Sequence, residues 1–249
     1  MKHSIHPEPH AAQDGSADRD VTNRVHATDA EHARQVDASS VKALRGRRPG
    51  GAPRLDALAQ HQKWTRETLG LSDGRACDLD VGFGRGGSLR YWVAQRAETA
   101  GRELLAIEIK HGCAASVHAW AAARQADHVS VFQGDVLMLL RMRAVDLRFN
   151  RIFVHFPDPW WKARHAKRKV LRSDTLPSFW DALEPGGHLY LQTDVEDRAQ
   201  SFIALAGALP GAHLTRPDRN PYPSVSNREV RAEQDGLPIF RVDVAKAML

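Results

Sequence analysis

Hydrophobic and polar positions change their spacing repeatedly after residue 54, and they predict strands and helices in alternation. Short apolar runs are typical of buried strands, and apolar residues recurring every three or four positions are typical of amphipathic helices. The expected strands are residues 76–81, 104–109, 128–132, 151–156, 188–193 and 239–245. The expected helices are residues 55–69, 87–98, 113–125, 136–143, 176–183 and 195–207, with a turn at 185–187.

This alternation predicts an α/β fold with a doubly wound, mainly parallel, Rossmann-like sheet and helices on both of its faces. In such sheets, ligands bind outside the carboxyl ends of the strands, near the point where the strand order reverses. Residues that directly follow strands are therefore the first candidates for chemistry.

The N-terminal segment differs from the rest of the chain. Residues 1–50 contain no Phe, Trp or Tyr and only six Val, Ile or Leu residues. Such a segment buries too little apolar surface to offset the entropy lost on ordering. We expect a disordered polar and basic tail over residues 1–53 and one domain over residues 54–249. The arginine cluster at 45–48 suits either contact with nucleic acid phosphates or an ordinary charged linker.

Composition narrows the class of protein. No run of about 18 apolar residues occurs, and the N-terminus lacks the apolar stretch of a secretory signal, so we expect a cytoplasmic protein without membrane contact. Two cysteines, far apart, make a disulfide framework or a thiolate zinc site unexpected, and no other metal site is visible. The formal net charge of +5 permits an anionic partner without requiring one.

A glycine-rich segment follows the first strand of the domain. Gly82, Gly84 and Gly87 fit the pattern G-x-G-x-x-G, and Glu108 ends the next strand, where it could accept hydrogen bonds from ribose hydroxyls. These features suit a nicotinamide-dependent oxidoreductase as well. Asp80, however, would repel a pyrophosphate and would attract an ammonium and a sulfonium, which favours S-adenosylmethionine. The alternatives are a glycine-rich turn without a ligand and a turn-capping role for Asp80.

Asp135 follows the third strand after Gly134. It lies where the adenine edge of such a cofactor could be contacted. It is equally placed to cap the helix expected at 136–143, and the two roles are compatible.

The loop after the fourth strand combines an acid, aromatic residues and basic residues. Pro157 and Pro159 hold Asp158 at the carboxyl edge of the sheet, and two tryptophans follow. Five Lys or Arg residues occur within positions 162–169, a mixture that suits stacking on bases and pairing with phosphates. A solvated helix start or a nuclear-import signal would account for the basic run but not for the residues before it.

Residues 158–168 resemble the Pro-Asp-Pro-Trp and Lys-x-Arg-His-x-Lys-Arg signature of the bacterial tRNA (guanine-N7-)-methyltransferases, a class I S-adenosylmethionine-dependent family. The resemblance extends from about residue 60 to the C-terminus and includes residues 80–86, Glu108, Asp135, Gly186-Gly187 and Thr193-Asp194. It implies a methyltransferase fold and methyl transfer from S-adenosylmethionine to N7 of a guanine in tRNA. The implied acceptor is the variable-loop guanosine. Whether the enzyme is a monomer or a homodimer stays open.

The resemblance also implies roles for individual residues. The catalytic residue is Asp158. The cofactor-binding residues are Asp80, Gly82, Gly84, Glu108, Asp135 and Asp158. The substrate-binding residues are Lys162, Asp194, Ser226, Asn227, Arg228 and Glu229. We expect the RNA backbone to be held by Arg164, Lys167 and Arg168.

The C-terminal motif departs from the family pattern Thr-x-aromatic-Glu-x-Arg-Gly. Ser226 keeps the hydroxyl, and Glu229 and Arg231 are retained. Arg228, however, replaces the aromatic residue, and Ala232 replaces the glycine. A divergent RNA methyltransferase with another acceptor, or a non-catalytic RNA-binding relative, is therefore the alternative prediction.

Overall fold

The computed structural model describes residues 51–58, 63–157 and 169–248. The expected tail lies outside these residues except for its last three positions. Of those, Ala52 is buried, and the carbonyl of Pro53 accepts a hydrogen bond from the amide of Gln133 at 2.9 Å. Within the described ranges, no helix combines the length and the apolar character needed to cross a membrane.

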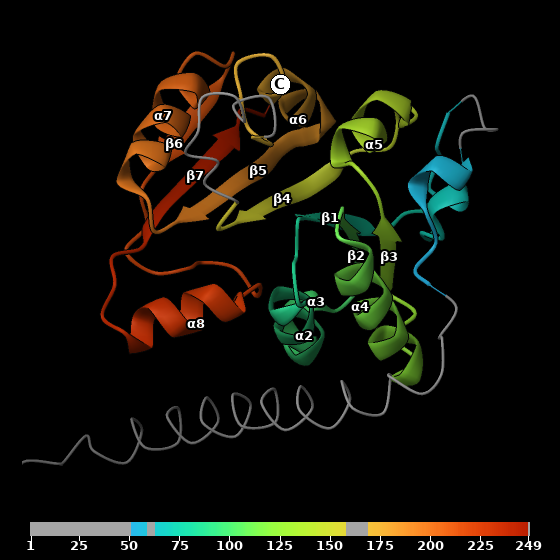
Figure 1. Ribbon diagram of the computed structural model, residues 1–249. Coiled ribbons are helices and arrows are strands. Elements are labelled where there is room, and N and C mark those ends of the chain that lie inside the picture. The colour runs from blue at the N-terminus through green and yellow to red at the C-terminus, as the bar shows by residue number, and fades with distance from the viewer. Residues whose placement is uncertain (1–50, 59–62, 158–168, 249) are drawn as a thin grey trace, which may run out of the picture. The chain divides into compact units, whose positions relative to one another are not determined.

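One sheet of seven strands forms the centre of the domain, in the order β3-β2-β1-β4-β5-β7-β6 (Figure 1). Its strands are β1 (Ala76–Val81), β2 (Arg102–Glu108), β3 (Val129–Gln133), β4 (Phe149–His155), β5 (Leu183–Thr193), β6 (Ala212–Thr215) and β7 (Phe240–Lys246). Strands β1 to β5 run parallel, whereas β7 is antiparallel to both β5 and β6. The predicted mainly parallel, doubly wound sheet is confirmed.

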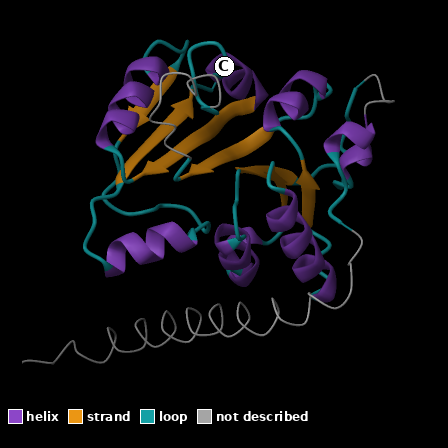
Figure 2. Ribbon diagram, viewed as in Figure 1, coloured by secondary structure: helices purple, strands orange, loops and turns teal. Residues whose placement is uncertain are grey.

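Helices cover both faces of the sheet, as predicted (Figure 2). One face carries α5 (Val136–Met142), α6 (Leu176–Ala182) and α7 (Glu196–Ala206). The other carries α2 (Gly87–Ala94), α3 (Arg96–Thr99), α4 (His111–Ala123) and α8 (Asn227–Gln234). Side chains alternate along each strand between these two faces.

The two faces differ in polarity along β4 and β5. Ile152, Val154, Leu189 and Leu191 join the large apolar core beneath α5, α6 and α7. The intervening positions lie on the face that carries α8, and they include polar residues of β4, β5 and β7. They are Arg151, His155, His188, Gln192, Arg241 and Asp243.

The helix expected at 55–69 is wrong for the described part of that range. It contains two short 3₁₀ helices, η1 (Leu55–Leu58) and η2 (Glu67–Leu69). Trp64 is fully buried, its amide donates to the carbonyl of Met142, and its carbonyl accepts from Ala144, both at 2.8 Å. These tertiary bonds use the backbone groups that a continuous helix would require.

Several other elements differ from the prediction. The helix expected at 87–98 breaks at Gln95 into α2 and α3. The turn expected at 185–187 lies inside β5, where the register against β4 shifts and Gly186 adopts a φ of 73°. Strand β6 and helix α8 were not expected.

Candidate functional site

The glycine loop follows β1 and turns sharply. The amide of Gly82 donates to the carbonyl of Ile107 at 2.8 Å, and Gly82 and Gly84 have φ values of 70° and 57°. Only glycine adopts this left-handed region readily. A side-chain carbon added to either glycine would meet no atom of the described chain within 4 Å. The loop therefore leaves open space beside its backbone, as close approach of a ligand requires.

Asp80 lies fully buried at the end of β1, below this loop. Its Oδ2 accepts a hydrogen bond from Ser88 Oγ at 2.5 Å, while its Oδ1 has no hydrogen-bond partner among the described residues. Burial, opposed by the Ser88 bond and assisted by the charge of Glu108, raises the pKa of Asp80 to about 7. A buried carboxylate oxygen without a partner is costly. An ammonium group placed there would relieve that cost, so Asp80 fits the cofactor that the sequence predicts.

Glu108 braces the loop from the end of β2. Its Oε2 accepts from the amide of Gly84 and its Oε1 from the amide of Lys110, both at 2.8 Å. The carboxylate is thereby fixed beside the open space. Each oxygen retains a further lone pair for a hydroxyl donor, so the predicted ribose contact is compatible with this geometry.

Asp135 caps helix α5, the more ordinary of its two expected roles. Its Oδ1 accepts from the amide of Leu137 at 2.9 Å. The preceding amide, of Gly134, donates to the carbonyl of Glu108 at 3.0 Å, which brings both acids to the same edge of the sheet. The contact with adenine stays a prediction.

The end of β4 is strained. Phe156 has a φ of 44°, in the left-handed region that side chains with a Cβ rarely adopt, and its amide donates to the carbonyl of Gln192 at 2.7 Å. Such strain costs about 1–3 kcal/mol and persists only where the surrounding structure imposes it. The next segment is the predicted catalytic and basic loop. Its expected site residues, Asp158, Lys162, Arg164, Lys167 and Arg168, lie outside the described residues.

Helix α8 brings the divergent C-terminal motif to the glycine loop. Ser226 is its N-cap, with Oγ accepting from the amide of Glu229 at 3.1 Å. A side-chain carbon at Gly87 would lie 2.7 Å from the backbone nitrogen of Asn227, so only glycine permits this approach. The first turn of α8 therefore packs directly against the start of α2.

Arg228 extends from that first turn to Asp194, which follows the last residue of β5. Its Nε and Nη2 both donate to Asp194 Oδ2, the former at 3.1 Å. The two side chains are 45% and 24% exposed. The pair thus stands at the carboxyl edge of the sheet, open to solvent.

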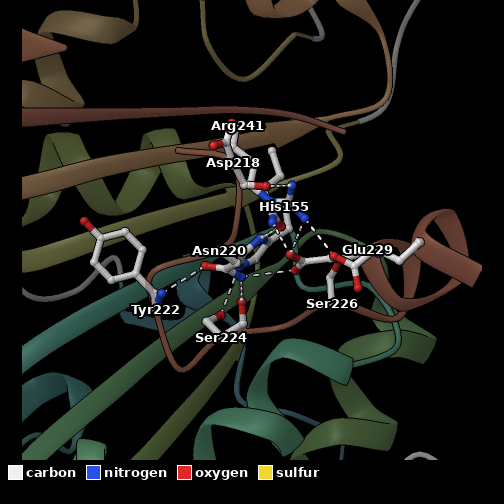
Figure 3. Close-up of polar contacts among 10 residues, drawn as sticks. His155, Asp218, Asn220, Tyr222, Ser224, Ser226, Glu229 and Arg241 are labelled. Atoms are coloured by element: carbon white, nitrogen blue, oxygen red, sulfur yellow. Dashed lines mark hydrogen bonds and ion pairs between the residues drawn. The ribbon is translucent and has the colours of Figure 1, made fainter. Parts of the chain in front are cut away.

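A buried hydrogen-bond network lies beneath α8 (Figure 3). The carboxylate of Glu229, which is 2% exposed, accepts from Gln192 Nε2 at 2.5 Å, Asn220 Nδ2 at 3.1 Å and Arg241 Nη2 at 3.2 Å. Burial raises the pKa of Glu229 and these donors oppose that shift. The predicted substrate residue Glu229 is therefore directed into the protein.

His155 occupies the far end of the network. Gln192 uses its Nε2 to reach Glu229, so its Oε1 accepts from His155 Nδ1 at 2.7 Å. The other ring nitrogen, Nε2, then accepts from Ser224 Oγ at 2.9 Å. Burial lowers the pKa of His155 to about 4, and the ring is neutral at pH 7.

Sequence reasoning missed this network. The period of two along β4 and β5 already assigns His155 and Gln192 to the face that carries Asp80. The spacing Ser226-x-x-Glu229 is also a helix-start signal, and it could have located α8. No local signal pairs Asn220 or Arg241 with Glu229.

Within the described residues, no group of three or more His, Cys, Asp or Glu side chains could hold a metal ion.

Known proteins resemble this chain in sequence and in fold. The model of a family described as "Putative methyltransferase" matches residues 75–242. A solved methyltransferase homologue from Pyrococcus horikoshii has a TM-score of 0.52 and 14% identity, covering 69% of this chain and 62% of its own. At that identity, it shows the fold.

Several curated relatives carry the name tRNA (guanine-N(7)-)-methyltransferase. That of Synechococcus sp. (strain JA-3-3Ab) is 28% identical over 171 residues, 68% of this chain and 71% of the relative. That of Rhodopirellula baltica is 30% identical over 176 residues, 66% of this chain and 64% of the relative. That of Pseudomonas putida (strain W619) is 26% identical over 210 residues, 81% of this chain and 84% of the relative.

Proposed function

The chain belongs to the family described as "Putative methyltransferase", and we propose that it transfers a methyl group from S-adenosylmethionine to N7 of a guanine in tRNA. The resemblance noted in the sequence to the tRNA (guanine-N7-)-methyltransferases is confirmed by the curated relatives. We further propose the variable-loop guanosine as acceptor and 7-methylguanosine as product.

One observation carries the proposal most directly. The buried Oδ1 of Asp80, which has no hydrogen-bond partner in the described part of the chain, lies beneath a glycine loop with open space beside it. That loop contacts the first turn of α8 through Gly87 and Asn227. The residues suited to the cofactor and those suited to an acceptor base thereby meet at one edge of the sheet. This supports transfer between the two.

The proposed reaction depends on the orientation of the methyl donor and the acceptor base more than on proton transfer. When bound, S-adenosylmethionine supplies a methyl group on a positively charged sulfur. Guanine N7 carries a lone pair and no proton, so a strong general base is unnecessary. Orientation alone supplies about 7–11 kcal/mol in favourable cases. Asp158 and Asp194 would orient the base by accepting from N1–H and the N2 amino group, and would balance the positive charge that develops on it.

The basic loop would hold the nucleic acid. Lys162, Arg164, Lys167 and Arg168 follow Asp158 closely in the sequence and would pair with backbone phosphates. Replacing Lys167 and Arg168 together by alanine should weaken tRNA binding and flatten its dependence on salt.

The test is methyl transfer from labelled S-adenosylmethionine to unmodified bulk tRNA, followed by nucleoside analysis. Label in 7-methylguanosine is the expected result. Label in another nucleoside would replace the proposal with a divergent RNA methyltransferase. Absence of both label and cofactor binding would favour a non-catalytic RNA-binding protein. Asp158→Ala should abolish turnover while tRNA binding persists, and loss of cofactor binding alone in this variant would overturn its assigned role.

A further inference from the structure

The Arg228–Asp194 pair differs from the ion pair directly beneath it. Arg241 and Glu229 are 7% and 2% exposed and belong to the buried network, whereas Arg228 and Asp194 are 45% and 24% exposed. An exposed pair of this kind contributes little to stability. The fold therefore gives no structural reason for Arg228 at this position.

The pair also has unused hydrogen-bonding capacity. Both bonds end on Oδ2 of Asp194 and start from Nε and Nη2 of Arg228. Among the described residues, neither Asp194 Oδ1 nor Arg228 Nη1 has a hydrogen-bond partner. A carboxylate oxygen and a guanidinium N–H are thus presented side by side at the carboxyl edge of the sheet.

This combination matches one base in particular. The edge of guanine that is distant from N7 carries two donors, N1–H and the N2 amino group, beside one acceptor, O6. A carboxylate complements the two donors, and a guanidinium complements the acceptor. Adenine presents an amino group in place of O6 and a lone pair in place of N1–H, so it would leave both protein groups without partners.

We propose that Arg228 is a specificity-determining residue that donates to O6 of the acceptor guanine, with Asp194 accepting from the opposite side of the same edge. This inference rests on the proposed function. Arginine commonly reads guanine by binding O6 and N7 together. Here N7 must stay free for the methyl group, and the tie to Asp194 holds the guanidinium on the O6 side. Position 228, where the sequence departs from the family pattern, thereby takes a recognition role.

The test uses tRNA ligated from fragments, with guanosine, 6-thioguanosine or adenosine at the mapped acceptor position. Sulfur replaces the O6 acceptor by a weak one and leaves N1–H, the N2 amino group and N7 in place. The wild-type protein should lose about 10- to 100-fold in kcat/KM on 6-thioguanosine, the range expected for a lost charged hydrogen bond. Arg228→Met should lose as much on guanosine and nothing further on 6-thioguanosine. Its discrimination against adenosine should fall by a similar factor.

Arg141→Met is the matched control. Arg141 is exposed in the last turn of α5, on the opposite face of the sheet, so its loss removes the same charge without changing the motif at the start of α8. It should behave as wild type. Unchanged thermal stability and S-adenosylhomocysteine binding would show that Arg228→Met is folded.

The outcomes separate the two proposals. Equal losses in wild type and Arg228→Met when O6 becomes sulfur, or full activity of Arg228→Met on guanosine, would overturn the role of Arg228 while leaving methyl transfer intact. Absence of 7-methylguanosine with the wild-type protein would instead overturn the proposed function, and this inference with it.

Discussion

The same face of the sheet is covered in two different ways. Over β1, β2 and β3, here called the cofactor half, α2 and α4 pack through apolar side chains such as Leu89, Trp92 and Val117. Over β4, β5 and β7, the acceptor half, the segment 216–234 is held by hydrogen bonds with His155, Gln192 and Arg241. Apolar burial stabilises in proportion to the area removed from water, whereas a hydrogen bond stabilises only while its partner is in place.

The two kinds of support suit the two ligands that we propose for this fold. The loop that would hold the cofactor stands on a close-packed base, which preorganises it. The helix that would meet the acceptor base stands on a polar network whose net stabilisation per bond is only about 1 kcal/mol. We therefore expect segment 216–234 to open at a lower free energy than the cofactor half.

Removing one central residue from each half tests this difference most directly. Glu229→Ala removes the buried carboxylate that accepts from Gln192, Asn220 and Arg241. Arg241 keeps Glu233 and Asn220 keeps the carbonyl of Ser224, so we expect a cost of about 1.5–3 kcal/mol, as for other hydrogen bonds to a charged group. Leu89→Ala leaves a cavity and typically costs 2–5 kcal/mol. Hydrogen exchange should show lost protection confined to 216–234 in the first variant and spread over β1, α2 and β2 in the second. Wild-type protection of α8 in Glu229→Ala would contradict the assigned role of the network.

The two halves also contain buried titratable groups with opposite pH behaviour. Burial lowers the pKa of His155 from 6.5 to about 4 in the folded protein. Between these two pH values, the unfolded chain therefore binds a proton at His155 that the folded protein does not bind. Stability from this group is complete above pH 6.5 and falls as the pH drops towards 4. The raised pKa of Asp80 acts in reverse, since its stabilising effect is lost as the pH rises from 3.8 to about 7.

His155→Asn separates these two contributions. Asparagine keeps a donor for Gln192 but does not titrate. Relative to wild type, this variant should remove a slope in unfolding free energy of up to about 1.4 kcal/mol per pH unit between pH 6.5 and 4. Denaturant unfolding at half-unit pH intervals measures it. Identical slopes in the two proteins would mean that His155 does not stay neutral in the folded state.

In the cofactor half, we expect the affinity for S-adenosylmethionine to depend on pH. Asp80 must be ionised to pair with an ammonium, so affinity for S-adenosylmethionine should rise by up to about tenfold per pH unit below pH 7. Asp80→Asn should bind weakly with no such rise. Ser88→Ala removes the hydrogen bond that lowers the pKa of Asp80, and it should move the midpoint to higher pH. Calorimetry with wild type showing no pH dependence in this range would exclude Asp80 as the partner of the ammonium.

The two halves were not equally predictable from the sequence. The sequence signals for the cofactor half are local. Asp80, the glycines and Glu108 lie at fixed positions relative to strands that have clear apolar patterns. The acceptor half depends on pairings such as His155 with Ser224 and Glu229 with Arg241, which alternation along one strand does not specify. Helix α8 is polar apart from Ala232 and Val230, so hydrophobic periodicity does not reveal it. Buried Trp64 shows the converse, because its tertiary bonds replaced a helix that the pattern favours.

The smallest expected effect compares two helix caps, Asp135 on α5 and Ser226 on α8. Replacing either by alanine typically costs about 1 kcal/mol. The consequences should differ, because α5 buries Val136, Leu139 and Leu140, whereas the buried residues of α8 are Glu229 and Ala232. Asp135→Ala should leave α5 protected from hydrogen exchange, while Ser226→Ala should let the first turn of α8 fray, move Arg228 away from Asp194 and raise KM for tRNA. Ser226→Thr, which restores a capping hydroxyl, should recover both values. Equal fraying of the two helices would mean that α8 is held by apolar packing as firmly as α5, and the contrast between the two halves would fail.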